Sequence, residues 1–238
     1  MHSSANPAAI WIVEDDQVLA ESLVLLLTLS GFQNCRHFES AEGCIQAIQR
    51  SKNWSLSPIC MLLDIRLGSM SGTQLFEQLQ ANNWPWPVLF MSGHGDLPMA
   101  VDLLKRGAYD YLPKPCEPLR LIEKVTEALQ ASEEILIEQQ EQQQHLERLQ
   151  TLTGHEQLVF QGVLSNKTTR MIADDMSNST RTIETHRANI LKKMKVGSAL
   201  ELAQVHERFL MRGGKLPFSV DLSAQTPSTA VPSPIAPD

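Results

Sequence analysis

Three short apolar runs, each followed directly by a polar side chain, constrain the fold of this chain more than any other feature. In the clearest run, Ile59–Leu63, five apolar residues are followed by Asp64. Ile10–Val13 ends in an acidic cluster, and Val88–Met91 ends in Ser92. Such runs are typical of buried strands. Because a carboxylate at the end of a buried strand is costly unless its charge is used there, these strand ends are candidates for a site.

Strands and helices alternate along the first half of the sequence. Apolar runs and stop signals predict strands over residues 9–13, 34–38, 59–63, 88–91 and 109–112. They predict helices over 17–30, 41–50, 73–82 and 97–106, and one starting near Pro118. In helix 17–30 we expect Val18, Leu19, Ser22, Leu23, Leu26 and Leu27 to share a face. Five such units with short connections predict an α/β fold with a parallel sheet covered by helices on both faces. Ligands bind such sheets at the carboxyl ends of the strands.

The segments around these strand ends resemble the receiver domain of two-component response regulators, over about residues 8–131. The matching motifs are Val13-Glu14-Asp15-Asp16, Leu63-Asp64-Ile65-Arg66, Met91-Ser92 and Asp110-Tyr111-Leu112-Pro113-Lys114-Pro115. The resemblance implies a five-stranded, doubly wound, flavodoxin-like sheet. It also implies that the domain accepts a phosphoryl group with the help of Mg²⁺.

The resemblance assigns a role to each residue of the site. Asp64 is the phosphoacceptor, and Ser92 and Lys114 contact the phosphoryl oxygens, with a cis bond between Lys114 and Pro115. Tyr111 is the switch residue that reports engagement of Ser92. The expected metal-binding residues are Glu14, Asp15, Asp64 and Arg66, the last through its backbone carbonyl. The loop Leu67-Gly68-Ser69-Met70-Ser71-Gly72 departs from the family's usual Leu-Pro-Gly-Met-Ser-Gly, which leaves its effect on hydrolysis and kinase recognition open.

The second half of the chain differs from the first in charge. Residues 1–150 hold 10 Lys and Arg against 19 Asp and Glu, whereas residues 151–214 hold 9 against 6. An acidic front and a basic back predict that only the back half meets nucleic acid. Four short helices are predicted there, over about 154–165, 169–176, 180–195 and 199–211.

Residues 179–194 resemble the recognition helix of LuxR-type helix-turn-helix domains. Ser179 is a suitable N-cap, and Ile183, Ile190, Leu191 and Met194 form the expected inward stripe. The predicted DNA-binding residues are Arg181, Thr182, Glu184, Thr185, Arg187, Ala188, Lys192 and Lys193. We expect Arg187, Lys192 and Lys193 to contact phosphates, which fix position without reading sequence. The turn before the helix departs from the family's Gly and apolar residue, because it reads Ser177-Asn178.

The expected organisation has four segments. The receiver domain is assigned to 8–131, a linker helix to 132–150 and the helix-turn-helix domain to 151–212. The Glu- and Gln-rich linker contains no Gly or Pro, so an extension of the preceding helix stays open. Its sequence favours a solvated helix over a coiled coil, since Gln139 and Gln143 interrupt the apolar seam. Residues 215–238, rich in Pro, Ser and Thr, are predicted to be a disordered tail.

The chain has no apolar stretch long enough to span a membrane and no signal peptide at its start, which predicts a cytoplasmic protein without membrane contact. The four cysteines have no metal-ligand spacing, so free thiols are favoured over disulfides, and a redox role stays open.

Together the two halves resemble the NarL/FixJ group of response regulators, and within it the FixJ group most. The resemblance implies a transcription regulator that a sensor histidine kinase phosphorylates and that binds double-stranded promoter DNA as a homodimer when phosphorylated. It implies no enzyme beyond slow self-dephosphorylation. A phosphatase of the haloacid dehalogenase type would need a second Asp where Arg66 stands. A receiver that signals without phosphate would lack the acidic pair or the Lys, and neither is missing. The stimulus, the kinase and the promoters are not legible in the sequence.

Overall fold

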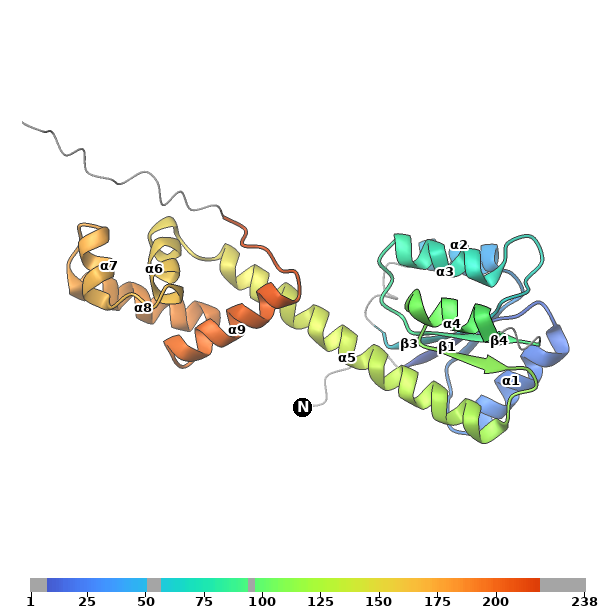
Figure 1. Cartoon of the computed structure of the whole chain (residues 1–238). Helices are drawn as coiled ribbons and strands as arrows, with labels where there is room; N and C mark the ends of the chain where they lie inside the picture. The colour runs from blue at the N-terminus through green and yellow to red at the C-terminus, as the bar shows by residue number, and fades with distance from the viewer. Residues whose placement is uncertain (1–7, 51–56, 94–96, 219–238) are drawn as a thin grey trace, which may run out of the picture. The chain divides into compact units, whose positions relative to one another are not determined.

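The computed structural model describes residues 8–50, 57–93 and 97–218 (Figure 1). These residues form two compact units, one ending at Gln140 and the other beginning at Glu141. The first unit contains a five-stranded parallel sheet in the order β2-β1-β3-β4-β5. Its strands are β1 (Ala9–Val13), β2 (Cys35–Phe38), β3 (Ile59–Asp64), β4 (Val88–Ser92) and β5 (Asp110–Pro113). The predicted fold class is therefore confirmed.

Five helices cover the two faces of this sheet. They are α1 (Gln17–Leu29), α2 (Ala41–Arg50), α3 (Gly72–Ala81), α4 (Leu97–Lys105) and the long α5 (Pro118–Gln150). Figure 1 shows α2, α3 and α4 on one face and α1 and the start of α5 on the other. Alternate strand residues point to opposite faces, so Trp11 and Met61 pack toward α2 and α3 whereas Ile12 and Leu62 pack toward α1 and α5.

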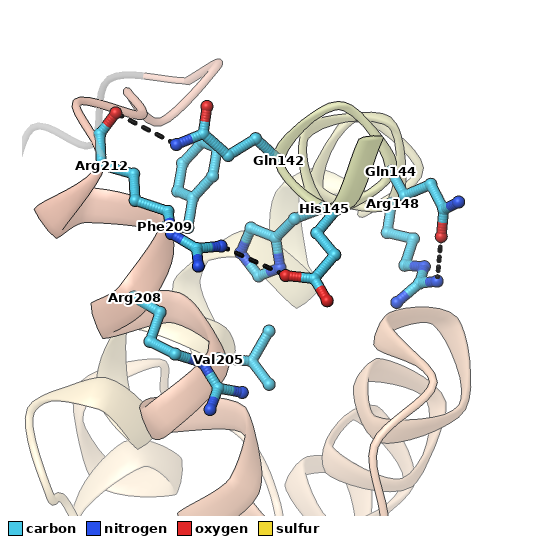
Figure 2. Close-up of a pocket in the computed structure, with 9 residues that line it drawn as sticks. Gln142, Gln144, His145, Arg148, Val205, Arg208, Phe209 and Arg212 are labelled. Atoms are coloured by element: carbon cyan, nitrogen blue, oxygen red, sulfur yellow. Dashed lines mark hydrogen bonds and ion pairs between the residues drawn. The ribbon is translucent and has the colours of Figure 1, made fainter. Parts of the chain in front are cut away.

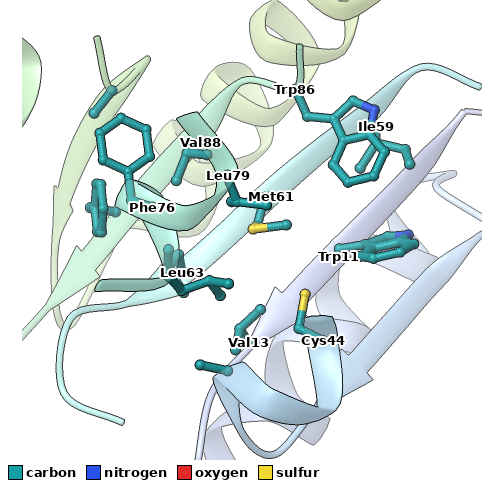
Figure 3. Close-up of a cluster of buried hydrophobic side chains, with 14 of the residues drawn as sticks. Trp11, Val13, Cys44, Ile59, Met61, Leu63, Phe76, Leu79, Trp86 and Val88 are labelled. Carbon is teal, nitrogen blue, oxygen red and sulfur yellow. The ribbon is translucent and has the colours of Figure 1, made fainter. Parts of the chain in front are cut away.

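Aromatic side chains fill the core on the α2–α4 side of the sheet (Figure 3). The Trp11 ring lies 5.4 Å from the Trp86 ring, and the Phe76 and Phe90 rings meet edge to face at 5.3 Å. Trp11 and Phe90 are completely buried. These large rings anchor β1 and β4, the strands on either side of β3, and so fix where the ends of the strands lie.

The buried face of α1 differs from the predicted one. Ala20, Leu23 and Leu27 are buried, whereas Val18 is 75% exposed and Ser22 is also exposed. Leucine and valine occur on nearly every side of this helix, so its apolar pattern alone does not select one stripe. The prediction for Val18 and Ser22 was wrong.

Within its described residues, the second unit contains helices and no strands. It comprises the end of α5 together with α6 (Gly154–Leu164), α7 (Thr169–Asp175), α8 (Thr180–Met194) and α9 (Ala199–Met211). Side chains around Phe160, Ile183 and Ile190 form its core. Thr153, Thr168, Ser179 and Ser198 each cap a helix, because each hydroxyl accepts a hydrogen bond from the backbone N–H three residues later.

The predicted linker of 132–150 extends the preceding helix, which the absence of Gly and Pro allowed, but it is not solvated along its whole length. Residues 118–150 form one continuous helix, and both ends of the proposed linker are buried. Ser132 is 1% exposed, and its Oγ accepts a 3.0 Å hydrogen bond from the backbone N–H of Ile59 at the start of β3. His145 and Leu149 lie in the core of the second unit. Only the middle of the helix, including Gln139 and Gln140, is solvated in the way that the sequence suggested.

The predicted disordered tail begins too early. Leu216 and Phe218 pack against the core of the second unit, with the Phe218 ring 6.5 Å from that of Phe160. The apolar side chains of these two residues explain the difference, because they can pack against the core. The Pro- and Ser-rich sequence that follows has few apolar side chains of this kind. The rest of the predicted tail, 219–238, lies outside the described residues.

Candidate functional site

Three carboxylates meet where β1 and β3 end. Glu14 and Asp15 follow β1, and Asp64 is the last residue of the neighbouring β3. One oxygen from each of the three lies within 4.8 Å of the others. Glu14 and Asp64 are buried, with exposed fractions of 2% and 7%, whereas Asp15 is exposed. In the sheet the strands lie in the order β2-β1-β3, so the strand order reverses at the boundary between β1 and β3. This is the usual ligand position in such sheets.

Lys114 joins the carboxylates from the loop after β5. Its Nζ lies 2.5 Å from Glu14 Oε2 and 3.0 Å from Asp64 Oδ2. The backbone N–H of Lys114 donates to the carbonyl of Ser92 at 2.8 Å, which holds the loop against the end of β4. The bond between Lys114 and Pro115 is cis, as predicted.

The charges of this cluster do not balance. Glu14, Asp15 and Asp64 bring three negative charges, and Lys114 brings one positive charge. Burial raises the pKa of Glu14, the hydrogen bond and charge of Lys114 lower it, and the charge of Asp64 raises it, so that the pKa lies above its ordinary value. Carboxylate oxygens are the ligands that Mg²⁺ prefers, and a divalent cation would relieve the remaining repulsion. The donor set therefore suits Mg²⁺.

The other predicted residues lie at the same edge of the sheet. Ser92 ends β4 and is 5% exposed, and the β3–β4 register places Asp64 beside Met91, its neighbour in the chain. The backbone N–H of Arg66 donates to Asp64 Oδ1 at 3.2 Å, and this keeps the Arg66 backbone at the site. Tyr111, on β5, is half-buried against the α2–α4 side of the core.

The loop after Asp64 is held at both ends despite its altered sequence. A Cβ added to Gly72 would lie 2.0 Å from the carbonyl oxygen of Asp64, so only glycine fits there. Ser69 Oγ donates a 2.6 Å hydrogen bond to Glu42 at the start of α2. This bond lowers the pKa of Glu42. The serine thus ties the loop to α2 at a position where the family's usual sequence has glycine.

Sequence reasoning missed one residue at this site. His37, on β2, lies with its Nε2 2.8 Å from the carbonyl oxygen of Glu14 and is half-buried. The contact supports the backbone that carries the acidic cluster. The signal for this contact is the parallel pairing of β1 and β2. It sets Val13 opposite Phe38 and so brings the end of β2, with His37, beside Glu14.

The cysteines stay outside this site. All four are free thiols, and Cys44 and Cys60 are buried. Burial raises the pKa of Cys44 to about 12 and raises that of Cys60 as well. A thiol held in its neutral form is a poor nucleophile, so these two cysteines are packing residues.

In the second unit, α7 and α8 form a helix-turn-helix whose second helix has one buried and one exposed face. Ile183, Ile190 and Met194 are buried, and Leu191 packs partly against the same core. The exposed residues of α8 include Arg181, Glu184, Thr185, Ala188 and Lys192, all of them predicted to contact DNA. Thr182 and Arg187 are half-buried at the margin of this face.

Lys193 does not belong to that exposed face. Its Nζ lies 2.6 Å from Oε2 of Glu156, a residue that is 4% exposed, and donates to the carbonyl of Thr151 at 2.9 Å. Its charge is therefore paired within the unit, which argues against a contact with DNA phosphates, and that contact stays a prediction. The pairing was not visible in the sequence because the two residues are 37 positions apart.

The unusual turn between α7 and α8 places its left-handed backbone at Ser177, which has a φ of 51°. Asn178, the second residue of the turn, is bonded to the preceding helix. Its N–H donates to the carbonyl of Ala173 at 2.9 Å, and its Nδ2 donates to that of Met176 at 3.1 Å. The asparagine closes the turn with polar contacts in place of the family's apolar one.

Comparison with known proteins decides what these two sites belong to. The chain matches the response regulator receiver domain over residues 10–126 and the LuxR family of bacterial regulatory proteins over residues 150–206. It is 33% identical to the transcriptional regulatory protein FixJ of Bradyrhizobium diazoefficiens over 207 residues, which cover 87% of this chain and 96% of that one. The chain belongs to the LuxR-type response regulators. It is also 32% identical over 207 residues to the response regulator protein TodT of Pseudomonas putida, which covers 87% of this chain and 88% of that one.

Solved structures of response regulators have the same fold. The structure of StyR superimposes with a TM-score of 0.74 at 32% identity, covering 85% of this chain and 99% of that one. Full-length FixJ from B. japonicum, also 32% identical, gives a TM-score of 0.51 and covers 87% and 99%.

Membership of this family establishes the general role of the response regulator. It is a transcription regulator with a receiver and a DNA-binding domain rather than a conventional enzyme. The receiver domain implies a histidine kinase as partner and an acidic pocket for Mg²⁺, which Glu14, Asp15 and Asp64 provide. The LuxR-type domain implies DNA binding. Among the described residues, no helix is long and apolar enough to span a membrane.

Proposed function

We propose that Asp64 accepts a phosphoryl group from a partner histidine kinase, and that this modification switches the response regulator to promoter binding as a dimer. The observation that carries the proposal is the position of Lys114, whose Nζ contacts both Glu14 and Asp64 beside the exposed Asp15. This arrangement sets a nucleophilic carboxylate next to a cation at the open end of the sheet.

The reaction breaks one bond and forms one. A carboxylate oxygen of Asp64 attacks the phosphorus of a phosphohistidine and forms an acyl phosphate on Asp64. At the same time the P–N bond breaks, and the imidazole is the leaving group. Phosphoryl transfer needs positioning and charge stabilisation more than covalent help from the protein. Lys114 Nζ, now 3.0 Å from Asp64 Oδ2, would neutralise one oxygen of the new group, and the Ser92 hydroxyl would donate to another. Asp15 and Asp64 would hold Mg²⁺, which would supply further neutralisation of the phosphoryl charge.

Replacing Asp64 tests the assignment directly. Asp64→Asn should abolish modification by acetyl phosphate in the presence of Mg²⁺, because the amide is not a nucleophile. Asp16→Asn is the matched control: it removes a carboxylate at the same edge, and asparagine is as good an N-cap for α1 as the aspartate now there. Intact mass spectrometry reads out the result. A phosphoryl group still added to Asp64→Asn would assign the chemistry to another residue.

Ser92 and Tyr111 offer a route from the site to the surface. If the Ser92 hydroxyl turned toward a phosphoryl group, it would vacate space that the half-buried Tyr111 on β5 could fill. The neighbouring surface of α4 and β5 exposes Met99, Val101, Leu104 and Tyr109 by 37–43% each. An apolar patch of this kind, close to Lys105 and Arg106, suits contact with a second copy. We assign the dimer interface to this surface.

Sedimentation of the phosphorylated protein tests the switch. The phosphorylated wild type should dimerise, whereas Ser92→Ala should accept phosphate yet dimerise poorly, because it cannot engage the new group. Reversing a hundredfold bias takes about 5.5 kcal/mol. If the phosphorylated wild type stayed monomeric at every concentration, with unaltered DNA affinity, this mechanism would be wrong even if Asp64 is the acceptor.

A further inference from the structure

A cavity of about 450 Å³ in the second unit belongs to neither site described above. It lies between the end of α5 and α9 and is lined by residues of that unit alone (Figure 2). Its volume falls within the range of about 300–1,000 Å³ that small-molecule sites occupy. No residue proposed to contact DNA lines it.

The walls of this cavity carry a surplus of positive charge. Arg148, Arg208 and Arg212 line it together with a single carboxylate, that of Glu141. Arg212 Nη1 lies 3.1 Å from Glu141 Oε2, and Arg208 makes no ion pair with any residue in the described part of the chain. Each guanidinium has five N–H donors in a planar fork that matches a carboxylate. The cavity therefore selects for an anion, and Arg208 is the residue with the most donors to offer.

Aromatic rings form an apolar wall beside the arginines. The rings of His145 and Phe209 lie 4.7 Å apart, and the two residues are 3% and 5% exposed. His145 Nε2 lies 3.2 Å from His206 Nδ1, while His145 Nδ1 is buried without a hydrogen-bond partner among the described residues. Burial, with the charges of His206 and Arg148, lowers the pKa of His145 to about 4, so the ring is neutral at pH 7. This wall suits a flat apolar body that carries a polar group.

We propose that the cavity binds a small carboxylate with a planar apolar body, its carboxylate on Arg208 and Arg212 and its body against Phe209. A phosphate of the DNA backbone is the other anion that the arginines could hold. The aromatic wall argues against it, because a phosphodiester offers no apolar face to pack against Phe209 and His145 where they line the cavity. The inference does not depend on phosphorylation of Asp64.

Benzoate is a suitable probe, with benzamide as its uncharged analogue and inorganic phosphate as an anion without an apolar body. Isothermal titration of the full chain should show saturable benzoate binding, with benzamide and phosphate each at least tenfold weaker. Arg208→Gln should weaken benzoate binding about tenfold, since a charge-assisted hydrogen bond is lost. This variant should fold normally because Arg208 is exposed and unpaired with any described residue.

Arg170→Gln is the matched control, because Arg170 is an exposed arginine of α7 outside the cavity, and it should bind benzoate like the wild type. Three results would overturn the proposal: no saturable benzoate binding, benzamide or phosphate binding as tightly as benzoate, or Arg208→Gln binding benzoate unchanged. If Arg208→Gln instead lost affinity for all DNA sequences and had a reduced salt slope, without any benzoate effect, the cavity would be a backbone-phosphate site.

Discussion

Glu14 in the first unit and Glu156 in the second are both buried glutamates beside a lysine, at distances of 2.5 Å and 2.6 Å. Burial pushes the pKa of each upward. For Glu156, hydrogen bonds from Lys193 and from the backbone and hydroxyl of Thr153 outweigh burial, and the pKa ends below its ordinary value. For Glu14, the neighbouring Asp64 adds to burial and Lys114 does not compensate, so the pKa ends above it.

The difference separates a structural ion pair from a site for a cation. Glu156 finds all its partners within its own unit, where it completes the capping box of α6. Glu14 shares one lysine with Asp64 and is left short of positive charge. A carboxylate whose pKa is raised by burial and by a neighbouring like charge is typical of functional sites, whereas a buried carboxylate that is fully paired is typical of packing.

The largest expected effect is on the structural pair. Lys193→Gln should lower the free energy of unfolding of the second unit by about 2 kcal/mol, because it leaves buried Glu156 without its cation. Lys193 is itself partly exposed, so the loss should be smaller than for a fully buried ion pair. Lys192→Gln is the matched control on the exposed face. It should leave stability unchanged and weaken binding to all DNA sequences, with a salt slope reduced by about 0.9. Chemical denaturation and DNA titrations at several salt concentrations measure both.

The pH dependence of Lys193→Gln sharpens the same test. The folded-state pKa of Glu156 is lowered, so its contribution to stability is present above the unfolded pKa of 4.5 and is lost as the pH falls through the folded value. The gap between wild type and variant should therefore close in acid. A gap that is constant from neutral pH into acid would contradict the assignment of Glu156 as the partner.

Glu14→Gln should act in the opposite direction in the absence of metal. Because the folded-state pKa of Glu14 is raised, its charge opposes folding, and any stability it contributes is present below the unfolded pKa of 4.5 and lost as the pH rises through the folded value. At neutral pH the variant should melt at a higher temperature than the wild type. Added Mg²⁺ should then raise the melting temperature of the wild type more than that of the variant.

Glu39→Gln, at an exposed position after β2, is the control for loss of one negative charge. It should change neither the melting temperature nor the response to Mg²⁺. If Glu14→Gln melted lower than wild type without metal, Glu14 would be a structural residue like Glu156, and the distinction between the two pairs would fail.

The smallest expected effect concerns the backbone of the second unit. Ser177→Gly should raise the free energy of unfolding by about 1 kcal/mol, because Ser177 has a φ of 51° and a side chain is disfavoured there. Ser165→Gly, at a helix end with a φ of −82°, should instead be slightly destabilising. Denaturant titration of both variants compares them. Equal effects at the two positions would mean that the left-handed turn stores no strain.

Sequence predicted this fold well where one kind of residue dominates a segment. The central strands were placed to within a residue, because runs such as Ile59–Leu63 have few alternatives to a buried strand. Asp64 and Lys114 were predicted to meet, and they do, because parallel strands bring their carboxyl ends to one edge.

Prediction was weaker where one long-range partner decides the outcome. Ser132 is a polar residue in a polar stretch, and only the N–H of Ile59 explains its burial. Lys193 carried the same signal as Lys192 until Glu156 was found beside it. Val18 was misplaced for another reason, since α1 is apolar on more than one side. The periodic pattern of apolar residues shows neither the distant partners of Ser132 and Lys193 nor the side of α1 that is buried.

The close approach at Gly72 has a consequence for how the protein can vary. At Gly72, one end of the loop that follows Asp64, any side chain would collide with the Asp64 carbonyl. At Gly68, near the other end, an added Cβ meets nothing within 4 Å. A saturation library across this loop should therefore recover only glycine at position 72 and a broad range of residues at position 68. Position 68 can therefore vary without disturbing the backbone that carries the acceptor aspartate, whereas position 72 cannot.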